Sequence, residues 1–299
     1  MAHPPDILKL LKKVRRIQMK SRKVVDEFMA GQFRSAFKGT GIEFHEVRDY
    51  LAGDDIRSID WNVTARTGTL HVKTYMEERE LCVFFLADLS ASAAFGSGAL
   101  FKSEAIAEFC ALLGLSAATN NDRVGMILFS DRIDRHIPPR KGMQHGLRIV
   151  RELLSHEPSS RGGTDIHAAL QYLVRVRRRR AIVFLISDFL DQGFEKSLEL
   201  AAKRHDLIAV RVGDPRERVL DGHGVLRLRD LESGSERLVD LGNRKLVERY
   251  ARAASERTES LRRLFASLGV DFLDIEAGTP MAGLLRAFFL ERIRRRVRA

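Results

Sequence analysis

Apolar residues occur along much of this chain in short unbroken runs that alternate with longer helical patterns. The runs suited to buried strands cover residues 81–87, 124–129, 181–186, 207–212 and 270–275. Helical spacing of apolar residues covers 98–118, 143–154, 165–176, 193–203, 243–267 and 280–298. Continuous apolar runs are typical of strands buried on both faces, and their regular alternation with helices indicates a parallel sheet. The pattern therefore predicts an α/β fold with a doubly wound, mostly parallel sheet of the Rossmann type.

Two segments depart from this alternation. Residues 132–137 are expected to form an antiparallel strand at an edge of the sheet, which Pro138 and Pro139 would close. Residues 214–241 contain two short strand patterns around a turn, and they predict a two-stranded excursion. We therefore expect one sheet domain over residues 81–299, with a β excursion near 214–241.

The first 80 residues follow other patterns. In residues 1–34, apolar positions such as Ile7, Leu10 and Val14 recur at helical spacing among many basic residues. This predicts a small, basic amphipathic N-terminal helix, which either packs on the body or binds an anionic membrane surface or an acidic partner. Residues 35–80 combine turn signals, dense charge and an alternating strand pattern, so they predict a β-rich extension.

Composition narrows the class of protein. The net charge of the 299 residues is +11, but residues 1–23 contribute +7 and residues 286–299 contribute +5, which leaves the rest at −1. A nucleic-acid binder would spread positive charge over a folded face, so we expect no specific nucleic-acid ligand. No apolar stretch approaches the ~20 residues that cross a bilayer, and Cys82 and Cys110 lie in apolar patterns typical of reduced buried thiols. We therefore expect a cytoplasmic protein without a transmembrane segment.

Polar side chains follow the ends of two predicted strands. Asp88, Ser90 and Ser92 come directly after the run 81–87, and Asp188 follows the run 181–186. In an open α/β sheet, the carboxyl ends of the strands are where ligands bind. Carboxylate and hydroxyl oxygens suit Mg²⁺, Mn²⁺ or Ca²⁺ better than zinc. The alternative for the Asp-x-Ser-x-Ser segment alone is that these residues cap the helix that follows.

A third loop adds a hydroxyl group to this set. Thr164 follows two glycines at the start of a helical pattern, and Asp165 beside it is a candidate for a position outside the direct ligands. The five residues Asp88, Ser90, Ser92, Thr164 and Asp188 are thus expected at one edge of the sheet.

This constellation resembles the metal-ion-dependent adhesion site of von Willebrand factor A domains, written Asp-x-Ser-x-Ser … Thr … Asp. One departure is Ala93, where many such domains have Met, but this position is not a ligand. The resemblance implies a von Willebrand A-like fold. It also implies direct metal contacts from Asp88, Ser90 and Ser92, with Thr164 a ligand in one of two states and Asp188 direct or water-mediated.

A second motif precedes this domain. The segment Gly-x-Glu-Phe-x-Glu-x-Arg-x-Tyr-x-x-Gly-Asp-Asp-x-Arg-x-Ile-Asp-Trp, from Gly41 to Trp61, is similar to the signature of domain-of-unknown-function family 58. Members of that family carry the motif directly before a von Willebrand A domain. The resemblance implies partnership with a MoxR-type AAA+ ATPase, with the chain acting as an adaptor.

The sequence thus favours a metal-dependent protein–protein interaction module that is not an enzyme. Neutral hydroxyls leave a bound cation incompletely neutralised, and in the resembled domains an acidic side chain of a partner protein completes the coordination. One alternative is a Mg²⁺-dependent phosphoryl-transfer enzyme, because an Asp with Mg²⁺ at a strand end also occurs there. Another is a nucleic-acid or membrane-surface binder that uses the basic ends, which would be strongly salt-dependent and insensitive to chelators.

Overall fold

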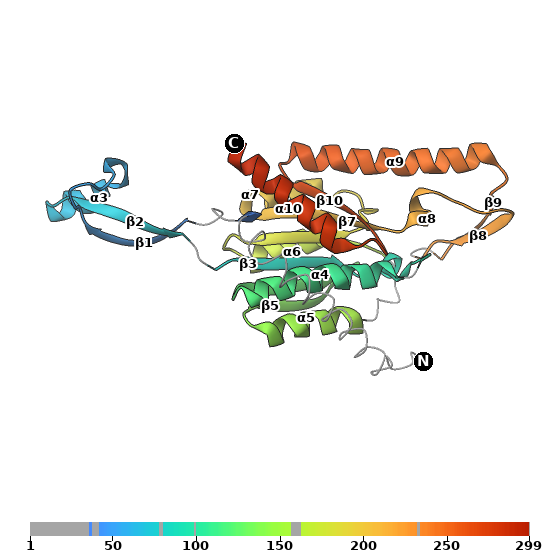
Figure 1. The fold of residues 1–299 in the computed structure, drawn as a ribbon, viewed down its shortest axis with the longest axis horizontal. Helices are drawn as coiled ribbons and strands as arrows, with labels where there is room; N and C mark the ends of the chain where they lie inside the picture. Colours follow the sequence, from blue (N-terminus) through green and yellow to red (C-terminus); the bar gives the residue numbers. More distant parts are fainter. Residues whose placement is uncertain are drawn as a thin grey trace.

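The computed structural model describes residues 36–37, 42–77, 80–98, 100–156, 163–231 and 234–298. At its centre lies a six-stranded sheet in the order β10-β7-β6-β3-β4-β5 (Figure 1). Its strands are β3 (Cys82–Asp88), β4 (Arg123–Phe129), β5 (Ile133–Arg140), β6 (Ile182–Ser187), β7 (Asp206–Gly213) and β10 (Asp271–Glu276). Every neighbouring pair is parallel except β4 with β5. The prediction of a mixed α/β fold with a mostly parallel sheet is therefore confirmed.

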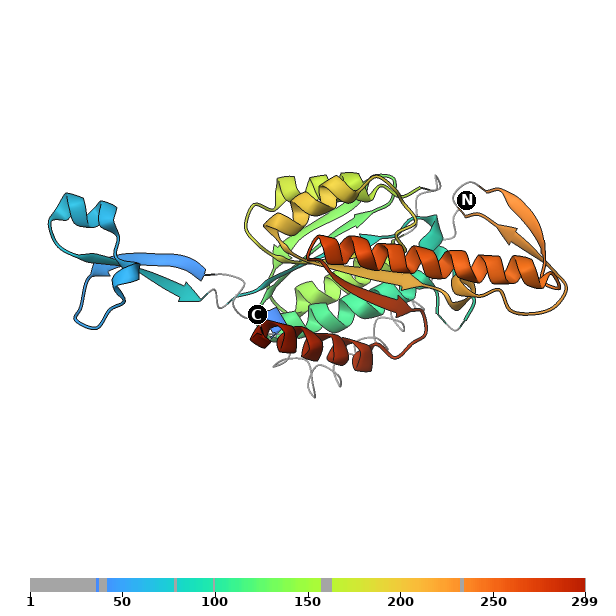
Figure 2. The same ribbon diagram turned by 90° about the horizontal axis from the view of Figure 1, so that it is seen from above.

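Helices cover both faces of this sheet, and the central strands send alternate side chains to each. Val83 and Phe85 of β3 pack into one core cluster, whereas Phe84 and Leu86 pack into the other. The first cluster includes residues of α4 (Lys102–Thr119), α5 (Met143–Ser155) and α10 (Met281–Arg298). The second includes residues of α6 (Ile166–Val176), α7 (Glu195–Arg204) and α9 (Arg244–Ser267). Figure 2 shows α4 and α10 on one side of the sheet and α6 and α7 on the other. Both faces of the sheet are therefore buried, as the unbroken apolar runs indicated.

The order of the strands creates a switch point between β3 and β6. The chain leaves β3 through α4 to β4 on one side, and it later returns to β6 on the other side of β3 before continuing to β7. At such a point the loops that follow the two strands diverge toward opposite faces, which opens the usual ligand-binding position of doubly wound sheets. Asp88 ends β3 and Asp188 directly follows β6, so both acids lie at this point.

The edge strand β5 corrects one expectation. The prediction that Pro138 and Pro139 end it is wrong, because the strand continues to Arg140. The register explains why: β5 pairs with β4 at Met126↔Ile137 and Val124↔Arg140, and the register shifts between these pairs. Proline is tolerated at edge strands and bulges because its missing N–H is not needed for a ladder bond there.

Residues 42–77 form a small module that Figures 1 and 2 both draw apart from the sheet, at one end of the molecule. It pairs β1 (Ile42–Asp49) with β2 (His71–Glu77) and contains η2 (Ile56–Ser58) and α3 (Trp61–Thr67) between them. Arg48 donates hydrogen bonds to both carboxylate oxygens of Asp54, at 2.7 and 2.8 Å. The Asp60 carboxylate caps α3 and lies 3.4 Å from the Lys73 ammonium. The strand near residue 70 agrees with the sequence pattern, whereas neither β1 nor α3 was predicted.

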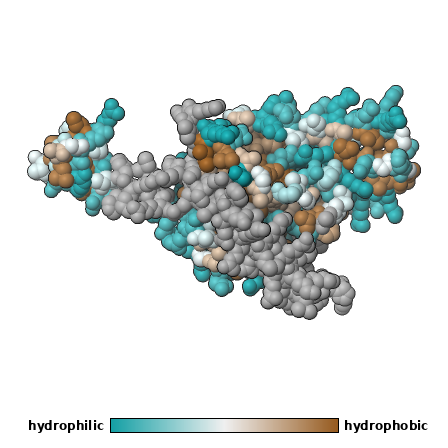
Figure 3. Space-filling view, in the orientation of Figure 1, coloured by the Kyte–Doolittle hydropathy of each residue, from teal (hydrophilic) through white to brown (hydrophobic). Residues whose placement is uncertain are grey.

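The segment between β1 and β2 exposes large apolar side chains. Leu51, Ile56 and Trp61 are each more than 60% exposed, and Leu70 is 45% exposed. Figure 3 shows hydrophobic surface on this module among polar residues. These side chains therefore contribute little to any core of the described chain.

A second small sheet follows β7. The short helix α8 (Pro215–Arg218) leads to the antiparallel pair β8 (Val225–Arg229) and β9 (Glu236–Asp240), so the expected two-stranded excursion is present. The predicted helix of residues 1–34 lies outside the described residues. Within the described parts of the chain, every helix is too short or too polar to cross a lipid bilayer.

The last helix fixes a segment from the start of the chain to the body. Arg292 of α10 is buried, and its guanidinium donates to both carboxylate oxygens of Asp206 at 2.5 Å and also to Asp271. The same group donates to the Ala36 carbonyl at 3.2 Å and lies 4.6 Å from the centre of the Phe37 ring. One arginine thus connects residues 36–37 with β7 and β10.

Candidate metal site at the carboxyl edge of the sheet

Asp88 is held at the end of β3 by groups from its own loop and from β6. It is 3% exposed. The Ser187 hydroxyl donates to Asp88 Oδ2 at 2.6 Å, and the Ser90 backbone N–H donates to Oδ1 at 3.0 Å. The Phe189 N–H in turn donates to Ser187 Oγ at 3.1 Å. The carboxylate of Asp88 is therefore oriented by hydrogen bonds that cross from one strand to its neighbour.

Ser90 and Ser92 lead from Asp88 toward the second acid. They stand at the start of the single turn η3 (Ala91–Ala94), where Ser90 has an extended backbone. The Ser92 hydroxyl donates to Asp188 Oδ2 at 2.7 Å, and Ser90 Oγ lies 3.1 Å from Ser92 Oγ. A serine hydroxyl has one proton, so Ser92 can only accept from Ser90 in this arrangement. Two side-chain hydroxyls therefore line the path between the two acids.

Thr164 is placed at the same edge by the backbone of its neighbour. The Asp165 N–H donates to the Ser130 carbonyl at 2.8 Å, directly after the end of β4. Gly163 has a φ of +150°, which residues with a side chain rarely adopt, so this loop depends on glycine. The register Asp88↔Phe129 puts the end of β4 beside Asp88. The loop of Thr164 thus lies over the strand that neighbours β3.

Asp165 has a structural role at the start of α6. Its Oδ1 accepts a hydrogen bond from the Ala168 N–H at 2.7 Å, which is the usual contact of a helix N-cap. A role outside the direct ligands stays a prediction for this residue.

Lys102 is a member of the site that sequence reasoning missed. It is 2% exposed, and its ammonium lies 2.8 Å from Asp188 Oδ2 and 2.7 Å from Glu217 Oε1. A basic residue in the first turn of a helix is unfavourable to the helix dipole. Lys102 begins α4, whose remaining residues are mostly buried. A lysine in the first turn of a predicted core helix was therefore the available signal for a buried ion pair.

Glu217 and Ser187 were also missed. Glu217 lies on α8, where its Oε2 accepts from the Asp214 N–H at 3.0 Å. Asp214 itself accepts from the backbone N–H and the hydroxyl of Ser97. Ser187 could have been identified because it directly precedes Asp188 at the end of a buried strand. Glu217, by contrast, is far from the other site residues in the sequence, and only the folded structure brings it to Lys102.

The two central acids differ in how strongly they hold a proton. Burial raises the pKa of Asp88 to about 7; the charge of Asp188 acts in the same direction, and hydrogen bonds from Ser187 and Ser90 oppose it. Burial also acts to raise the pKa of Asp188, but the charge of Lys102 and hydrogen bonds from Lys102 and Ser92 outweigh it and leave that pKa below its ordinary value. The charge of Asp188 is thus balanced by the Lys102 ammonium. No cation is among the groups that shift the pKa of Asp88.

The chemistry of the donors fits a hard cation. Among the residues that the structure describes, no group of three or more His, Cys, Asp and Glu side chains is arranged to hold a metal. An ion at this edge would therefore need serine and threonine hydroxyls in addition to the two acids. Such oxygen donors suit Mg²⁺, Mn²⁺ or Ca²⁺. The Lys102 ammonium, 2.8 Å from Asp188 Oδ2, opposes the binding of a divalent cation there.

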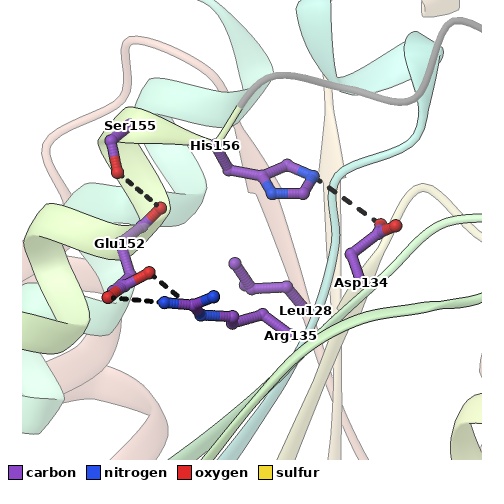
Figure 4. Close-up of a pocket in the computed structure, with 6 residues that line it drawn as sticks. All are labelled: Leu128, Asp134, Arg135, Glu152, Ser155 and His156. Carbon is purple, nitrogen blue, oxygen red and sulfur yellow. Dashed lines mark hydrogen bonds and ion pairs between the residues drawn. The ribbon is translucent and has the colours of Figure 1, made fainter.

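A separate pocket lies between the sheet edge and α5. It has a volume of about 360 Å³ and is lined by Leu128, Asp134, Arg135, Glu152, Ser155 and His156 (Figure 4). The lining residues belong to β4, β5 and the end of α5, so the pocket does not include the switch point. In it, His156 Nε2 lies 3.6 Å from Asp134 Oδ2, and Arg135 forms an ion pair with Glu152 at 3.3 Å. The charges of Arg135 and Glu152 thus pair with each other, and burial lowers the pKa of His156.

Comparison with known proteins identifies relatives over most of the chain. Uncharacterized protein Rv1480 of Mycobacterium tuberculosis is 31% identical over 285 residues, which cover 92% of this chain and 89% of the relative. Uncharacterized protein Mb1516 of Mycobacterium bovis matches over the same share of each chain at the same identity.

Solved structures give more distant likenesses. The hypothetical protein BatB of Bacteroides thetaiotaomicron is 17% identical with a TM-score of 0.46, over 72% of this chain and 99% of that one. The SpRpn10 VWA domain is 11% identical with a TM-score of 0.38, over 69% of this chain and 94% of that one. The assignment of the fold accordingly rests on the sheet order described above.

The family model described as "Protein of unknown function DUF58" matches residues 46–260. This range begins within β1 and includes Asp88, Ser90, Ser92, Thr164 and Asp188. By this match and by its relatives, the chain belongs to the DUF58 family.

Proposed function

We propose that this protein is a metal-dependent protein–protein interaction module with a von Willebrand A-like domain. Its metal site would be formed by Asp88, Ser90, Ser92, Thr164 and Asp188, and its ion would be Mg²⁺, with Mn²⁺ or Ca²⁺ as substitutes. The observation that carries the proposal is the continuous contact from Ser90 through Ser92 to Asp188, next to the buried Asp88. These oxygens come from two neighbouring strand ends at the switch point of the sheet, where ligands of such folds collect.

The residues of the site would contribute two kinds of metal ligand. Ser90, Ser92 and Thr164 offer neutral hydroxyl oxygens, and Asp88 and Asp188 offer charge. When bound, the ion supplies an incompletely neutralised positive charge that attracts an acidic side chain of a partner. Ser187 keeps Asp88 aimed toward the serines, because its hydroxyl donates to the carboxylate oxygen that faces β6. The affinity for the partner would thus depend on the strand ends staying in register.

The proposed activity is binding without bond cleavage. Asp88 accepts hydrogen bonds on both carboxylate oxygens, from Ser187 and from the Ser90 N–H, and this arrangement suits a fixed ligand better than an attacking nucleophile. The alternative is Mg²⁺-dependent phosphoryl transfer. Turnover of a generic phosphoester by the purified protein, lost in Asp88→Ala, would favour the enzyme and contradict the binding module.

The proposed partner is a MoxR-type AAA+ ATPase, for which the protein would act as an adaptor in the cytoplasm. The support for this part is the resemblance of the motif from Gly41 to Trp61, which the family membership reinforces. The motif covers β1, η2 and the first residue of α3, and its residues Leu51, Ile56 and Trp61 are exposed.

The proposal is tested by a pull-down of the purified ATPase with the full chain. We expect capture with Mg²⁺, loss of capture with EDTA, and loss in Asp88→Ala. Glu259→Ala removes an exposed acid on α9 and serves as the matched control, which should bind as the wild type does. Capture by Asp88→Ala in the presence of EDTA would contradict a metal-bridged contact. Mn²⁺ binding by electron paramagnetic resonance separates the two parts, because it reports on the ion without the partner.

A further inference from the structure

Asp188 accepts hydrogen bonds on both carboxylate oxygens from groups of the protein itself. Its Oδ2 accepts from the Ser92 hydroxyl at 2.7 Å and from the Lys102 ammonium at 2.8 Å. Its Oδ1 accepts from the Leu190 backbone N–H at 3.2 Å. A divalent ion that binds Oδ2 must therefore displace one of its two donors or share the oxygen with it.

Lys102 has a second acceptor farther from the site centre. Its ammonium lies 2.7 Å from Glu217 Oε1, as close as it lies to Asp188. The Glu217 side chain is 24% exposed, whereas that of Asp188 is 6% exposed. The other carboxylate oxygen of Glu217, Oε2, accepts a hydrogen bond from the Asp214 N–H at 3.0 Å, which fixes the position of the side chain. The ammonium thus bridges an inner and an outer carboxylate.

The Lys102 ammonium and a bound divalent ion would repel each other. A lysine ammonium and a divalent ion that share one buried carboxylate repel each other across a few ångströms, where little water screens them. The Lys102 side chain is only 2% exposed, so it cannot simply turn into solvent. Glu217 is the acceptor already in contact with it that could hold it while Asp188 faces an ion.

We propose that Lys102 is an internal cation that competes with the divalent ion for Asp188, and that Glu217 holds the ammonium when the ion is bound. This inference rests on the proposed metal site and specifies how its affinity is set. Lys102 balances Asp188 in the metal-free site and weakens metal binding. Glu217 connects occupancy of the site to α8, because the same carboxylate caps the Asp214 N–H at the start of that helix.

The test is a titration of the purified full chain with Mn²⁺, followed by electron paramagnetic resonance. Lys102→Met keeps the length of the side chain and removes the charge, so we expect Mn²⁺ to bind at least about ten-fold more tightly than to the wild type. Lys203→Met removes the charge of an exposed lysine on α7 and is the matched control, with an affinity near that of the wild type. Glu217→Gln should bind Mn²⁺ several-fold more weakly, and this effect should largely disappear in the double variant with Lys102→Met.

The outcomes distinguish competition by Lys102 from the existence of the metal site. If the wild type binds Mn²⁺ and Lys102→Met binds it equally or more weakly, competition by Lys102 is wrong and the metal site stands. If only Lys102→Met binds, Lys102 is shown to be the competing cation and the wild-type metal site is contradicted. If neither binds, both ideas fail. Should Lys102→Met not fold, Glu217→Gln decides, because unchanged or tighter Mn²⁺ binding by it would overturn the role of Glu217 as the alternative acceptor.

Discussion

The hydroxyl of Ser187 donates a 2.6 Å hydrogen bond to the buried carboxylate of Asp88, and this contact joins the ends of β6 and β3. The two residues are 99 positions apart in the chain. Both are almost fully buried, at 1% and 3% exposure. Because Asp88 has a raised pKa, each hydrogen bond that favours its charged form matters for whether the carboxylate can serve a cation.

Replacement of Ser187 by alanine tests this contact. We expect Ser187→Ala to lower the free energy of unfolding by about 1–3 kcal/mol, because it leaves a buried carboxylate oxygen without its donor. Urea denaturation at neutral pH measures the change. Ser260→Ala, on the exposed face of α9, should change stability by no more than about 0.5 kcal/mol. Equal stability of Ser187→Ala and the wild type would show that this hydrogen bond is not important for the fold.

Asp165 is predicted to stabilise α6 through its carboxylate. Asp165→Ala should lower the free energy of unfolding by about 1 kcal/mol, because the Ala168 N–H loses its acceptor. Asp165→Asn should restore the wild-type value, since asparagine caps helices equally well. Thermal or urea unfolding of both variants checks this. A several-fold loss of Mn²⁺ affinity in the stable Asp165→Asn variant would add the role near the metal that the sequence suggested.

Arg292 is predicted to be the residue of α10 whose charge matters most. Arg292→Met should cost about 3–5 kcal/mol, because Asp206 and Asp271 lose a buried cation. Arg295 also contacts Asp271, but its side chain is 56% exposed. Arg295→Met should therefore cost no more than about 1 kcal/mol. Similar losses in the two variants, measured by urea denaturation, would contradict the importance of the buried position.

His205 is predicted to make stability depend on pH. It is 1% exposed, and both ring nitrogens are buried without a hydrogen-bond partner. Burial lowers its pKa from 6.5 to about 4, and the charges of Arg177, Arg204 and Arg180 act in the same direction. Between these two pKa values the unfolded chain binds more protons than the folded chain, so stability falls as the pH drops below 6.5.

The expected size of this effect follows from the shift. Between pH 7.5 and pH 5, His205 should account for a loss of about 2 kcal/mol of unfolding free energy. His205→Phe should remove that part of the pH dependence, which urea denaturation at both pH values can measure. His223→Phe, at an exposed position before β8, is the control and should keep the wild-type dependence. Parallel pH profiles of wild type and His205→Phe would contradict the lowered pKa.

The sheet could be predicted because its strands obey one simple rule. Residues of β3 and β6 are buried on both faces, so each strand is apolar at nearly every position and ends where the first acid or hydroxyl appears. That end also marks the edge where Asp88 and Asp188 meet. The course of β5 could not be predicted in the same way, because a proline ends a strand or lies in a bulge depending on its partner, and the partner register is set by β4.

The charges around the site could be predicted only in part. Asp188 lies next to a buried strand, so its position follows from local pattern. Lys102 and Glu217 are 115 residues apart in the sequence. They come into contact because the fold brings α4 and α8 to the same edge of the sheet. No spacing rule relates such positions. The unfavourable position of Lys102 at the start of a helix was the one local signal of this contact in the sequence. It indicates that the lysine forms an ion pair but does not identify the partner residue.

The position of β10 and α10 has a consequence for dissecting this protein. The family match ends at residue 260, inside α9, whereas β10 pairs with β7 and α10 supplies Phe288 and Phe289 to the core. A fragment trimmed to the match would bare a long run of unpaired backbone groups on β7 and would uncover apolar surface on one face, a combination that promotes aggregation. Biochemical work on this protein should therefore retain the chain through the end of α10.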